Sequence, residues 1–292
     1  NTYKQFDPAP RYHARDTAIM LAKLHGAKTL LGTATPAFES IFNARQEKFG
    51  WAPLTSRYQD IAMPRILLAD LKTARRQGKT RSLFTPLLLK HIQGALENNE
   101  QIILFKNRRG FSQFLQCKRC GWVPHCKYCD VSLTYHKGIN QLSCHYCGYA
   151  ENIPQTCPKC SSGAIEMKGF GTERIEDDLQ LFFPEARVQR MDQDNTNTRR
   201  AHETILMDFQ MQKTDILVGT QMVTKGLDFE HVSVVGILDA DRLLHFPDFR
   251  AFERAYQLMT QVSGRAGRKH SQGTVIIQTY KKEHPVIQDV VH

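Results

Sequence analysis

The sequence predicts an α/β protein whose parallel sheet is interrupted by a small cysteine-rich module. Two observations carry this prediction. From residue 64 to the end of the chain, apolar strand-like runs alternate with amphipathic helical segments, and all eight cysteines fall between Cys117 and Cys160. Strands separated by helices imply a parallel sheet covered on both faces. Clustered Cys-x-x-Cys pairs are typical of metal-binding units.

Length and composition bound the class of protein. The 292 residues are 41% hydrophobic and 23% charged, as in ordinary globular proteins, and the length suits about two domains. The net charge of +10 favours a polyanionic partner. We find no apolar run of the roughly 18 residues that a membrane span needs and no signal-peptide pattern, so the sequence predicts a soluble cytoplasmic protein with no membrane partner.

The first 50 residues are predicted to be the tail of a domain. Their segment "TLLGTATPAFESIFNARQ" (29–46) is typical of a short strand, a Thr/Pro turn and then a helix. A single β-turn-α unit has no sheet of its own to join, which is why we interpret 1–50 as the end of a domain. A linker-like stretch, 54–64, follows.

Residues 64–292 are predicted to form one doubly wound α/β domain, with a zinc-binding module over 113–165 inserted into a loop. Strands are predicted at 65–71, 100–107, 187–192, 215–220, 232–238 and 273–279. Helices are predicted at 85–99, 171–183, 199–210 and 248–262.

The four Cys-x-x-Cys pairs are separated by five, fourteen and nine residues. Each pair can place two thiolates on one zinc ion, so four pairs predict two tetrahedral zinc sites. Fourteen residues suit a hairpin that joins the second and third pairs, which leaves the first and fourth pairs together. This nested pairing predicts zinc 1 at Cys117, Cys120, Cys157 and Cys160, and zinc 2 at Cys126, Cys129, Cys144 and Cys147. A crossed, RING-like pairing is the alternative.

Complete thiolate ligation leaves no open position for water, so both zinc ions are expected to be structural. His125, His136 and His145 are then surplus to ligation. Basic and aromatic residues interleave in the module, a pattern that suits stacking on single-stranded bases or packing between the knuckles.

Two segments mimic a nucleotide site. "TARRQGKT" (73–80) ends like a phosphate loop, but Thr73 stands where that loop needs glycine. "VVGILDAD" resembles a strand ending in magnesium-binding carboxylates, Asp239 and Asp241, although a core strand with acids at its end is favoured. Together they define one alternative function, a self-contained P-loop ATPase.

Two other segments suit an anion site. "GTQMVTKGLDF" (219–229) follows a strand, where doubly wound sheets bind ligands. "QVSGRAGR" (261–268) carries Arg265 and Arg268, whose spacing predicts two guanidinium groups on one helical face. Its small residues are expected to permit close approach of another lobe.

With "GTATP" (32–36), these segments have the order and character of motifs III, V and VI of superfamily 2 helicases. The chain resembles the PriA family of bacterial replication-restart helicases over essentially its whole length. The resemblance also rests on "ILFKNRRGF" (103–111), the cysteine array and "FPDFRAFERAYQL". It implies a RecA-like second lobe with an inserted two-zinc module, preceded by the end of the first RecA-like lobe. It also implies ATP-driven 3′ to 5′ unwinding of DNA and loading of the replicative helicase at stalled forks.

The resemblance implies roles for individual residues. Arg265 and Arg268 would reach the γ-phosphate of ATP across the cleft between lobes, as arginine fingers do. The cofactor-contacting residues that it implies are Gly226, Asp228, Thr33 and Thr35. The DNA-contacting residues that we expect are Tyr3, Phe6, Tyr12 and His13, of the family's aromatic-rich loop, and Thr220 and Gln221. Core aromatics are the alternative for the first group.

We find neither the family's lysine-bearing phosphate loop nor its "DEEH" motif, so we expect a fragment that cannot hydrolyse ATP alone. ATP and Mg²⁺ would bind to the full-length parent. Its partners would be forked or single-stranded DNA, primosome proteins and single-strand binding protein, and the protein would be a monomer. The alternative from a different class is a zinc-stabilised module that binds nucleic acid or protein without motor activity.

Overall fold

The computed structural model describes the chain in segments. They are residue 9 and residues 12–55, 62–80, 82–107, 114–129, 131–136, 141–144, 146–168, 173–191, 199–220, 229–267 and 272–292. Two compact units are present, Asn1–Pro36 and Ala37–His292, and each is described by itself. The domain limits expected from the sequence remain a prediction.

A six-stranded sheet forms the centre of the larger unit. Its strands are β1 (Arg65–Asp70), β2 (Gln101–Phe105), β8 (Val188–Met191), β9 (Ile216–Gly219), β10 (Val232–Ile237) and β11 (Thr274–Thr279). They lie in the order β1-β11-β10-β2-β9-β8, and every neighbouring pair is parallel. The doubly wound parallel sheet predicted from the alternating pattern is confirmed.

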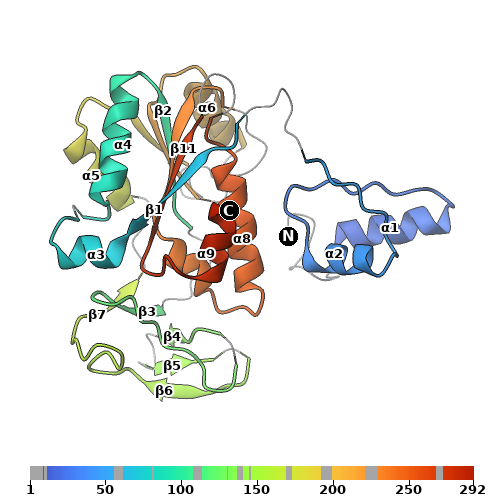
Figure 1. The fold of residues 1–292 in the computed structure, drawn as a ribbon, viewed down its shortest axis with the longest axis horizontal. Helices are drawn as coiled ribbons and strands as arrows, with labels where there is room; N and C mark the ends of the chain where they lie inside the picture. Colours follow the sequence, from blue (N-terminus) through green and yellow to red (C-terminus); the bar gives the residue numbers. More distant parts are fainter. Residues whose placement is uncertain are drawn as a thin grey trace. The chain divides into compact units, whose positions relative to one another are not determined.

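Helices cover both faces of this sheet (Figure 1). They are α3 (Leu71–Arg76), α4 (Pro86–Glu97), α5 (Glu173–Phe182), α6 (Arg199–Gln210), α7 (Ala240–Leu244), α8 (Ala251–Ser263) and α9 (Pro285–Val291). One buried core joins the sheet to α4 and α5, and the other joins it to α6, α7, α8 and α9. Alternate residues of β2 supply the two cores, Ile102 and Leu104 to the first and Ile103 and Phe105 to the second, because side chains alternate across a strand.

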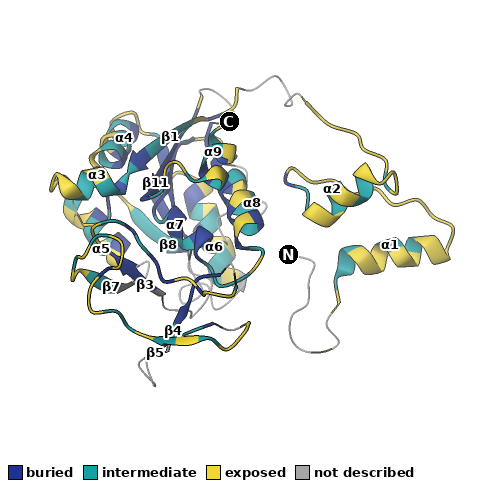
Figure 2. Ribbon diagram, turned by 60° about the horizontal axis from the view of Figure 1, so that its bottom comes forward, coloured by how far each residue is buried: buried dark blue, intermediate teal, exposed yellow. Residues whose placement is uncertain are grey.

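Helix α4 illustrates how the sequence specifies these elements. Thr85 caps its N-terminus by accepting a hydrogen bond from the Leu88 N–H, and Pro86 occupies the first turn, where no intrahelical partner is lost. Leu88, Ile92 and Ala95 are buried and repeat at helical spacing. Figure 2 shows the buried strands between the helices that cover them.

The cysteine-rich module lies between β2 and α5 in the chain and forms two small antiparallel sheets. The first consists of β3 (Phe114–Cys117) and β7 (Ile165–Lys168), and the second of β4 (Thr134–His136), β5 (Gln141–Ser143) and β6 (Ala150–Asn152). The module has its own small core, which includes Leu133, Leu142 and two of the cysteines. Since it follows the last residue of β2, it leaves the main sheet at its carboxyl edge.

The smaller unit contains α1 (Ala14–Leu24), which the sequence did not predict, and the helix predicted after the Thr/Pro turn is α2 (Phe38–Arg45), in the larger unit. The strand predicted near residue 30 is wrong. Residues 27–33 have no regular structure, and Leu30 is 98% exposed, so this apolar run pairs with no strand that the structure describes. No helix in the described segments combines the length and the apolar character needed to cross a membrane.

Candidate functional site

The cysteines gather into two groups of four. One contains Cys117, Cys120, Cys157 and Cys160, and the other Cys126, Cys129, Cys144 and Cys147. Within each group the Sγ atoms all lie within 4.8 Å of one another. The structure therefore groups the cysteines in the nested pairing and not in the crossed one.

The sulfur separations fit one zinc ion per group. The Sγ atoms of Cys117 and Cys160 are 3.6 Å apart, and those of Cys126 and Cys147 are 3.5 Å apart. A tetrahedral site with Zn–S bonds of about 2.3 Å separates its sulfurs by roughly 3.8 Å, whereas a disulfide holds them at about 2.05 Å. Each group thus has the dimensions of a four-thiolate zinc site.

Tight turns hold three of the four Cys-x-x-Cys pairs. The N–H groups of Gly121, Gly148 and Ser161 donate to the carbonyls of Cys117, Cys144 and Cys157, at 2.9, 3.0 and 2.8 Å. All three donors have positive φ, which glycine adopts without strain. These turns bring the two sulfurs of their pairs to one side, toward the shared metal position.

The chemistry of the donor set also fits a divalent cation. Burial raises the pKa of Cys120 to about 12, and a hydrogen bond with the Cys147 thiol raises the pKa of Cys129 to about 12. The Ser162 N–H lowers the pKa of Cys160 to about 7. Four thiolates at contact distance repel one another, and a bound Zn²⁺ ion would remove that repulsion and displace the thiol protons. The residues present fit zinc.

Polar contacts dock the module on the lobe that the main sheet and its helices form. His245 follows α7 and is buried, and its Nδ1 lies 3.3 Å from the Ser132 Oγ of the module. Its Nε2 lies 2.9 Å from the Lys281 Nζ, and its ring meets that of His125 edge to face at 5.3 Å. Burial, and then the Lys281 ammonium, lower the pKa of His245 well below its usual value. The neutral ring therefore accepts at Nε2 from Lys281 and donates from Nδ1 to Ser132.

Backbone packing completes this docking. Gly121 has a φ of +73°, and a Cβ atom there would lie 2.6 Å from the Cβ of Tyr280, directly after β11. The N–H of Phe249 donates to the Tyr146 hydroxyl over 3.3 Å. Contacts from two separate segments of the module thus hold it against the lobe.

Neither mimic of a nucleotide site has the structure of one. Helix α3 begins at Leu71, and its N-cap residue, Asp70, accepts from the N–H groups of Lys72 and Thr73. The amides that would wrap a phosphate are therefore occupied within a helix, which contradicts the P-loop interpretation of 73–80. Asp241 is fully buried and accepts from the Thr279 hydroxyl and the Tyr280 N–H, at 3.1 and 2.9 Å. Asp241 therefore has the structural role that the sequence favoured, an acid at the end of a core strand.

The segment that carries Arg265 departs from its predicted conformation. Helix α8 ends at Ser263, so Arg265 lies in the following turn, and the prediction that its guanidinium projects from a helical face is wrong. The Arg265 N–H donates to the Val262 carbonyl, and the Gly267 N–H to the Val232 carbonyl at the start of β10. Arg268 lies outside the described residues.

The small residues of this turn have a local explanation. A Cβ atom at Gly273 would lie 2.4 Å from the Gly267 nitrogen and 2.5 Å from the Ala266 carbonyl carbon. Ala266 is buried, so the turn packs against the chain that enters β11. The small residues permit this approach within one lobe, and the approach of a second lobe that the sequence suggested remains a prediction.

The other predicted site residues are placed as follows. Thr35 is buried, and its N–H donates to the Thr33 Oγ1 over 3.1 Å. Thr220, the first residue after β9, is buried at the carboxyl edge of the sheet. Tyr12 is 48% exposed and His13 precedes α1. The predicted residues outside the described segments are Tyr3, Phe6, Gln221, Gly226 and Asp228.

Sequence reasoning missed the docking residues. His245, Tyr280 and Lys281 come from segments that follow α7 and β11, and only the fold brings them to the module. Their one local signal is a polar group directly after an apolar strand or helix, which also describes many surface loops. His125 is one of the three histidines that zinc ligation does not need. Its side chain lies in this docking surface and outside both cysteine groups.

Two family models match the chain. Residues 126–151 match the PriA DNA helicase Cys-rich region domain, and residues 170–270 match the helicase conserved C-terminal domain. The first match lies in the zinc module and the second covers α5 to Arg268. The comparison therefore assigns zinc binding to the module and a helicase-type fold to the lobe.

Curated relatives extend the match along the chain. The replication restart protein PriA of Bacillus subtilis is 46% identical over 288 residues, 99% of this chain and 36% of the relative. That of Haemophilus influenzae is 42% identical over 287 residues, 98% of this chain and 39% of the relative. The chain thus spans less than half the length of these relatives.

A solved structure supports the fold alone. S. cerevisiae Dbp5 L327V bound to RNA and ADP BeF3 superposes with a TM-score of 0.50 at 13% identity, covering 94% of this chain and 52% of Dbp5. Its likeness agrees with the helicase C-terminal match. Because close relatives match along almost the whole chain and the zinc-module model is specific to one family, the chain belongs to the PriA family of replication restart proteins.

Proposed function

We propose that the chain is the second helicase lobe, with the end of the first, of an ATP-dependent DNA helicase that unwinds DNA 3′ to 5′ and initiates primosome assembly at stalled forks. One observation carries the proposal. A helicase C-terminal domain and a PriA-type cysteine-rich region occur in one chain, and 99% of that chain aligns with a replication restart protein. The activity belongs to the longer protein, because the chain spans 36% of the B. subtilis relative.

Arg265 and Arg268 are the residues proposed to act on ATP. The hydrogen bond from Gly267 to Val232 anchors the Arg265 turn at the end of β10 that faces away from the zinc module. From there the two guanidinium groups would stabilise the γ-phosphate of an ATP–Mg²⁺ complex held by a phosphate loop elsewhere in the protein. Gly226, Asp228, Thr33 and Thr35 would line or sense that site. The chain alone would then hydrolyse no ATP.

DNA is the proposed substrate. The net charge of +10 supports a polyanionic partner, and Tyr128 and Tyr146 of the module are 78% and 51% exposed, so their rings are available to bases. Tyr3, Phe6, Tyr12, His13, Thr220 and Gln221 remain proposed DNA contacts. Primosome proteins and single-strand binding protein are proposed partners of a cytoplasmic, monomeric helicase.

Substitution of Arg265 by alanine in the full-length protein tests this function. We expect DNA-stimulated ATP hydrolysis to fall by roughly 10³-fold or more, because an arginine finger stabilises charge that develops in the transition state. The affinity for single-stranded DNA should change by less than about threefold. Both are measured on one preparation, by phosphate release and by fluorescence anisotropy, and Arg268→Ala is expected to behave alike.

Arg200→Ala, on the exposed side of α6, is the matched control and should leave both quantities unchanged. A binding module without motor activity makes the opposite prediction, since Arg265→Ala would then weaken DNA binding and leave any ATP hydrolysis as it was. DNA-stimulated turnover by the 292-residue chain alone would also contradict the proposal.

A further inference from the structure

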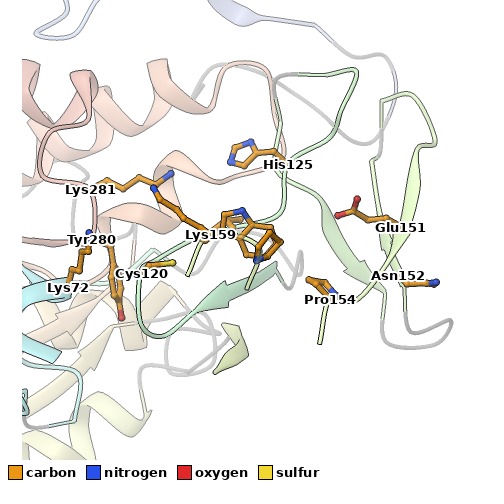
Figure 3. A pocket seen from close by; sticks show the side chains of 12 residues that line it. Lys72, Cys120, His125, Glu151, Asn152, Pro154, Lys159, Tyr280 and Lys281 are labelled. Carbon is orange, nitrogen blue, oxygen red and sulfur yellow. The ribbon is translucent and has the colours of Figure 1, made fainter. Parts of the chain in front are cut away.

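A pocket of about 550 Å³ lies where the zinc module meets the lobe. Figure 3 shows its lining, which comes from both partners: Lys72, Tyr280 and Lys281 belong to the lobe, and His125 and Lys159 to the module. Trp122 of the first zinc knuckle also lines it. Volumes of roughly 300 to 1,000 Å³ are usual for small-molecule sites, so a mononucleotide is of a suitable size.

The pocket concentrates ammonium groups. Lys72, Lys159 and Lys281 line it, and in the described part of the chain none of them forms an ion pair with a carboxylate. The amino ends of Lys159 and Lys281 point toward each other (Figure 3). Burial lowers the pKa of Lys281, the nearby Asp241 carboxyl raises it, and Lys159 lowers it to a smaller extent. Two ammonium groups that repel each other over a pocket form a receptor for an anion.

Negative charge at the pocket does not cancel this potential. Glu151 is the one carboxylate among the twelve lining residues, and it accepts a hydrogen bond from the Tyr149 hydroxyl. Zinc ligated by four thiolates carries two negative charges, which must be counted. Of those four sulfurs only that of Cys120 lines the pocket, and the backbone N–H of Trp122 donates to it.

The lining indicates the kind of anion. Closely spaced ammonium groups favour a dianionic phosphate monoester over a phosphodiester, which carries one negative charge. The indole of Trp122 offers aromatic surface to a base. Lys159 is exposed, whereas Lys281 is partly buried and held by His245, so one ammonium group stands at the entrance and the other within.

We propose that this pocket binds the terminal phosphate of a nucleotide, through Lys159 and Lys281 with Lys72 nearby, and with Trp122 beside the base. The phosphate would come either from a free nucleotide or from the 5′ end of a nucleic-acid strand. The site exists only while the zinc module is docked, so its occupancy would stabilise the docked module. It does not depend on the proposed helicase activity.

The chain has two tryptophans, Trp51 and Trp122, so a Trp51→Phe variant makes Trp122 a single fluorescent reporter in the pocket. This zinc-loaded variant is titrated with inorganic phosphate, with dTMP, and with an eight-nucleotide oligo-dT that carries either a 5′-phosphate or a 5′-hydroxyl. We expect saturable quenching by dTMP or by the 5′-phosphorylated oligomer, and at least tenfold weaker binding of the 5′-hydroxyl oligomer. The stronger of the two quenchers identifies the source of the phosphate.

Lys159→Met and Lys281→Met, made in the same background, should each weaken binding by about ten- to a hundredfold, because each removes a charged hydrogen-bond donor. Lys159 is exposed, so we expect Lys159→Met to keep the fold. It therefore tests the proposal even if Lys281→Met unfolds the module. Lys127→Met is the control, since that lysine is in the module and outside the pocket lining. All variants are compared at two zinc ions per chain.

Three results overturn the proposal. One is the absence of saturable quenching by every phosphate tested. Another is equal affinity for the two oligomers, which shows general contact with the DNA backbone. The third is loss of zinc from both lysine variants with unchanged phosphate binding after zinc is restored, which shows that the lysines only balance the thiolate charge.

Discussion

Asp241 shows how burial changes the chemistry of a single residue. Its side chain is inaccessible to solvent, and burial raises its pKa to about 6, although the Tyr280 N–H and the Thr279 hydroxyl oppose that rise. Its two hydrogen bonds tie the start of α7 to the end of β11, beneath the docked zinc module. The carboxyl group is therefore retained for its hydrogen bonds at some cost in free energy whenever it ionises.

This cost predicts a pH dependence of stability. A carboxyl whose pKa is raised on folding contributes stability that is fully present below about pH 4 and is lost as the pH rises through about 6. Asp241→Asn removes this dependence. The free energy of unfolding of the wild type, relative to the variant, should therefore fall by about 1 kcal/mol between pH 5 and pH 7. Urea denaturation across this range measures the difference.

Loss of zinc in acid should affect the wild type and Asp241→Asn alike, so it cancels from the difference between their free energies of unfolding. Asp289→Asn, at an exposed position on α9, is the control and should shift stability by a constant amount. Wild type and Asp241→Asn curves that stay parallel from pH 5 to pH 7 would show that Asp241 is not a buried acid.

At the scale of elements, alternation and length predicted the main sheet well. All six strands and helices α4, α5, α6 and α8 lie where apolar periodicity placed them, because each buries apolar side chains in one or both of the two cores on the faces of the sheet. In the larger unit, the described helices that periodicity missed are short. Helices α7 and α9 have five and seven residues, too few for a repeating stripe to be recognised.

The wrong strand near residue 30 has a different cause. A strand needs a neighbour for its backbone hydrogen bonds, and sequence reports the apolar run but not the neighbour. By contrast, the spacing of the cysteines suggested how they would group, because a tight turn within a close Cys-x-x-Cys pair fixes the positions of its two sulfurs. The spacing of Arg265 and Arg268 did not predict that Arg265 lies in the turn after α8, a turn whose backbone packs closely against Gly273 from another segment.

The turn after α8 should be sensitive to a single methyl group. In Gly273→Ala the new Cβ atom would overlap the backbone of Ala266 and Gly267, which cannot rotate away as a side chain could. We expect a loss of about 1 to 3 kcal/mol in the free energy of unfolding. In the full-length protein, ATP hydrolysis should fall together with stability, since the same turn carries Arg265.

Gly94→Ala is the matched control for that substitution. Gly94 lies inside α4, and a Cβ atom added there would have no atom outside its own helix backbone within 4 Å. Alanine should therefore stabilise the helix by about 0.5 to 1 kcal/mol. Thermal denaturation of both variants decides the matter. A Gly273→Ala protein as stable as the wild type would show that the turn tolerates displacement and that small residues are not required there.

For the whole molecule, the distribution of hydrophobic cores decides what zinc supports. The two cores on the faces of the main sheet draw on no residue between β2 and α5, as far as the structure describes them. The third core belongs to the module, and Cys126 and Cys144 are part of it. Zinc ligands thus double as packing residues in the module, whereas the sheet is packed without them.

Chelation of zinc should therefore unfold the module and spare the sheet. Each four-cysteine site contributes on the order of 10 kcal/mol to folding, far more than a core of this size can replace. In hydrogen exchange followed by mass spectrometry, amides of β4, β5 and β6 should lose protection, while those of β2, β10 and β11 keep it. The melting temperature of the sheet should fall by a few degrees as Tyr280 and His245 lose their partners in the module.

Cys126→Ser separates the two sites, because it should leave one zinc ion per chain and expose β4, β5 and β6 selectively. Zinc restored to the chelated wild type should restore protection, and zinc added to the variant should not. Protection of β5 in the metal-free protein would contradict a structural role for zinc. Collapse of β10 and β11 on chelation would instead show that the lobe cannot fold without its docked module, in conflict with the separate cores on either face of its sheet.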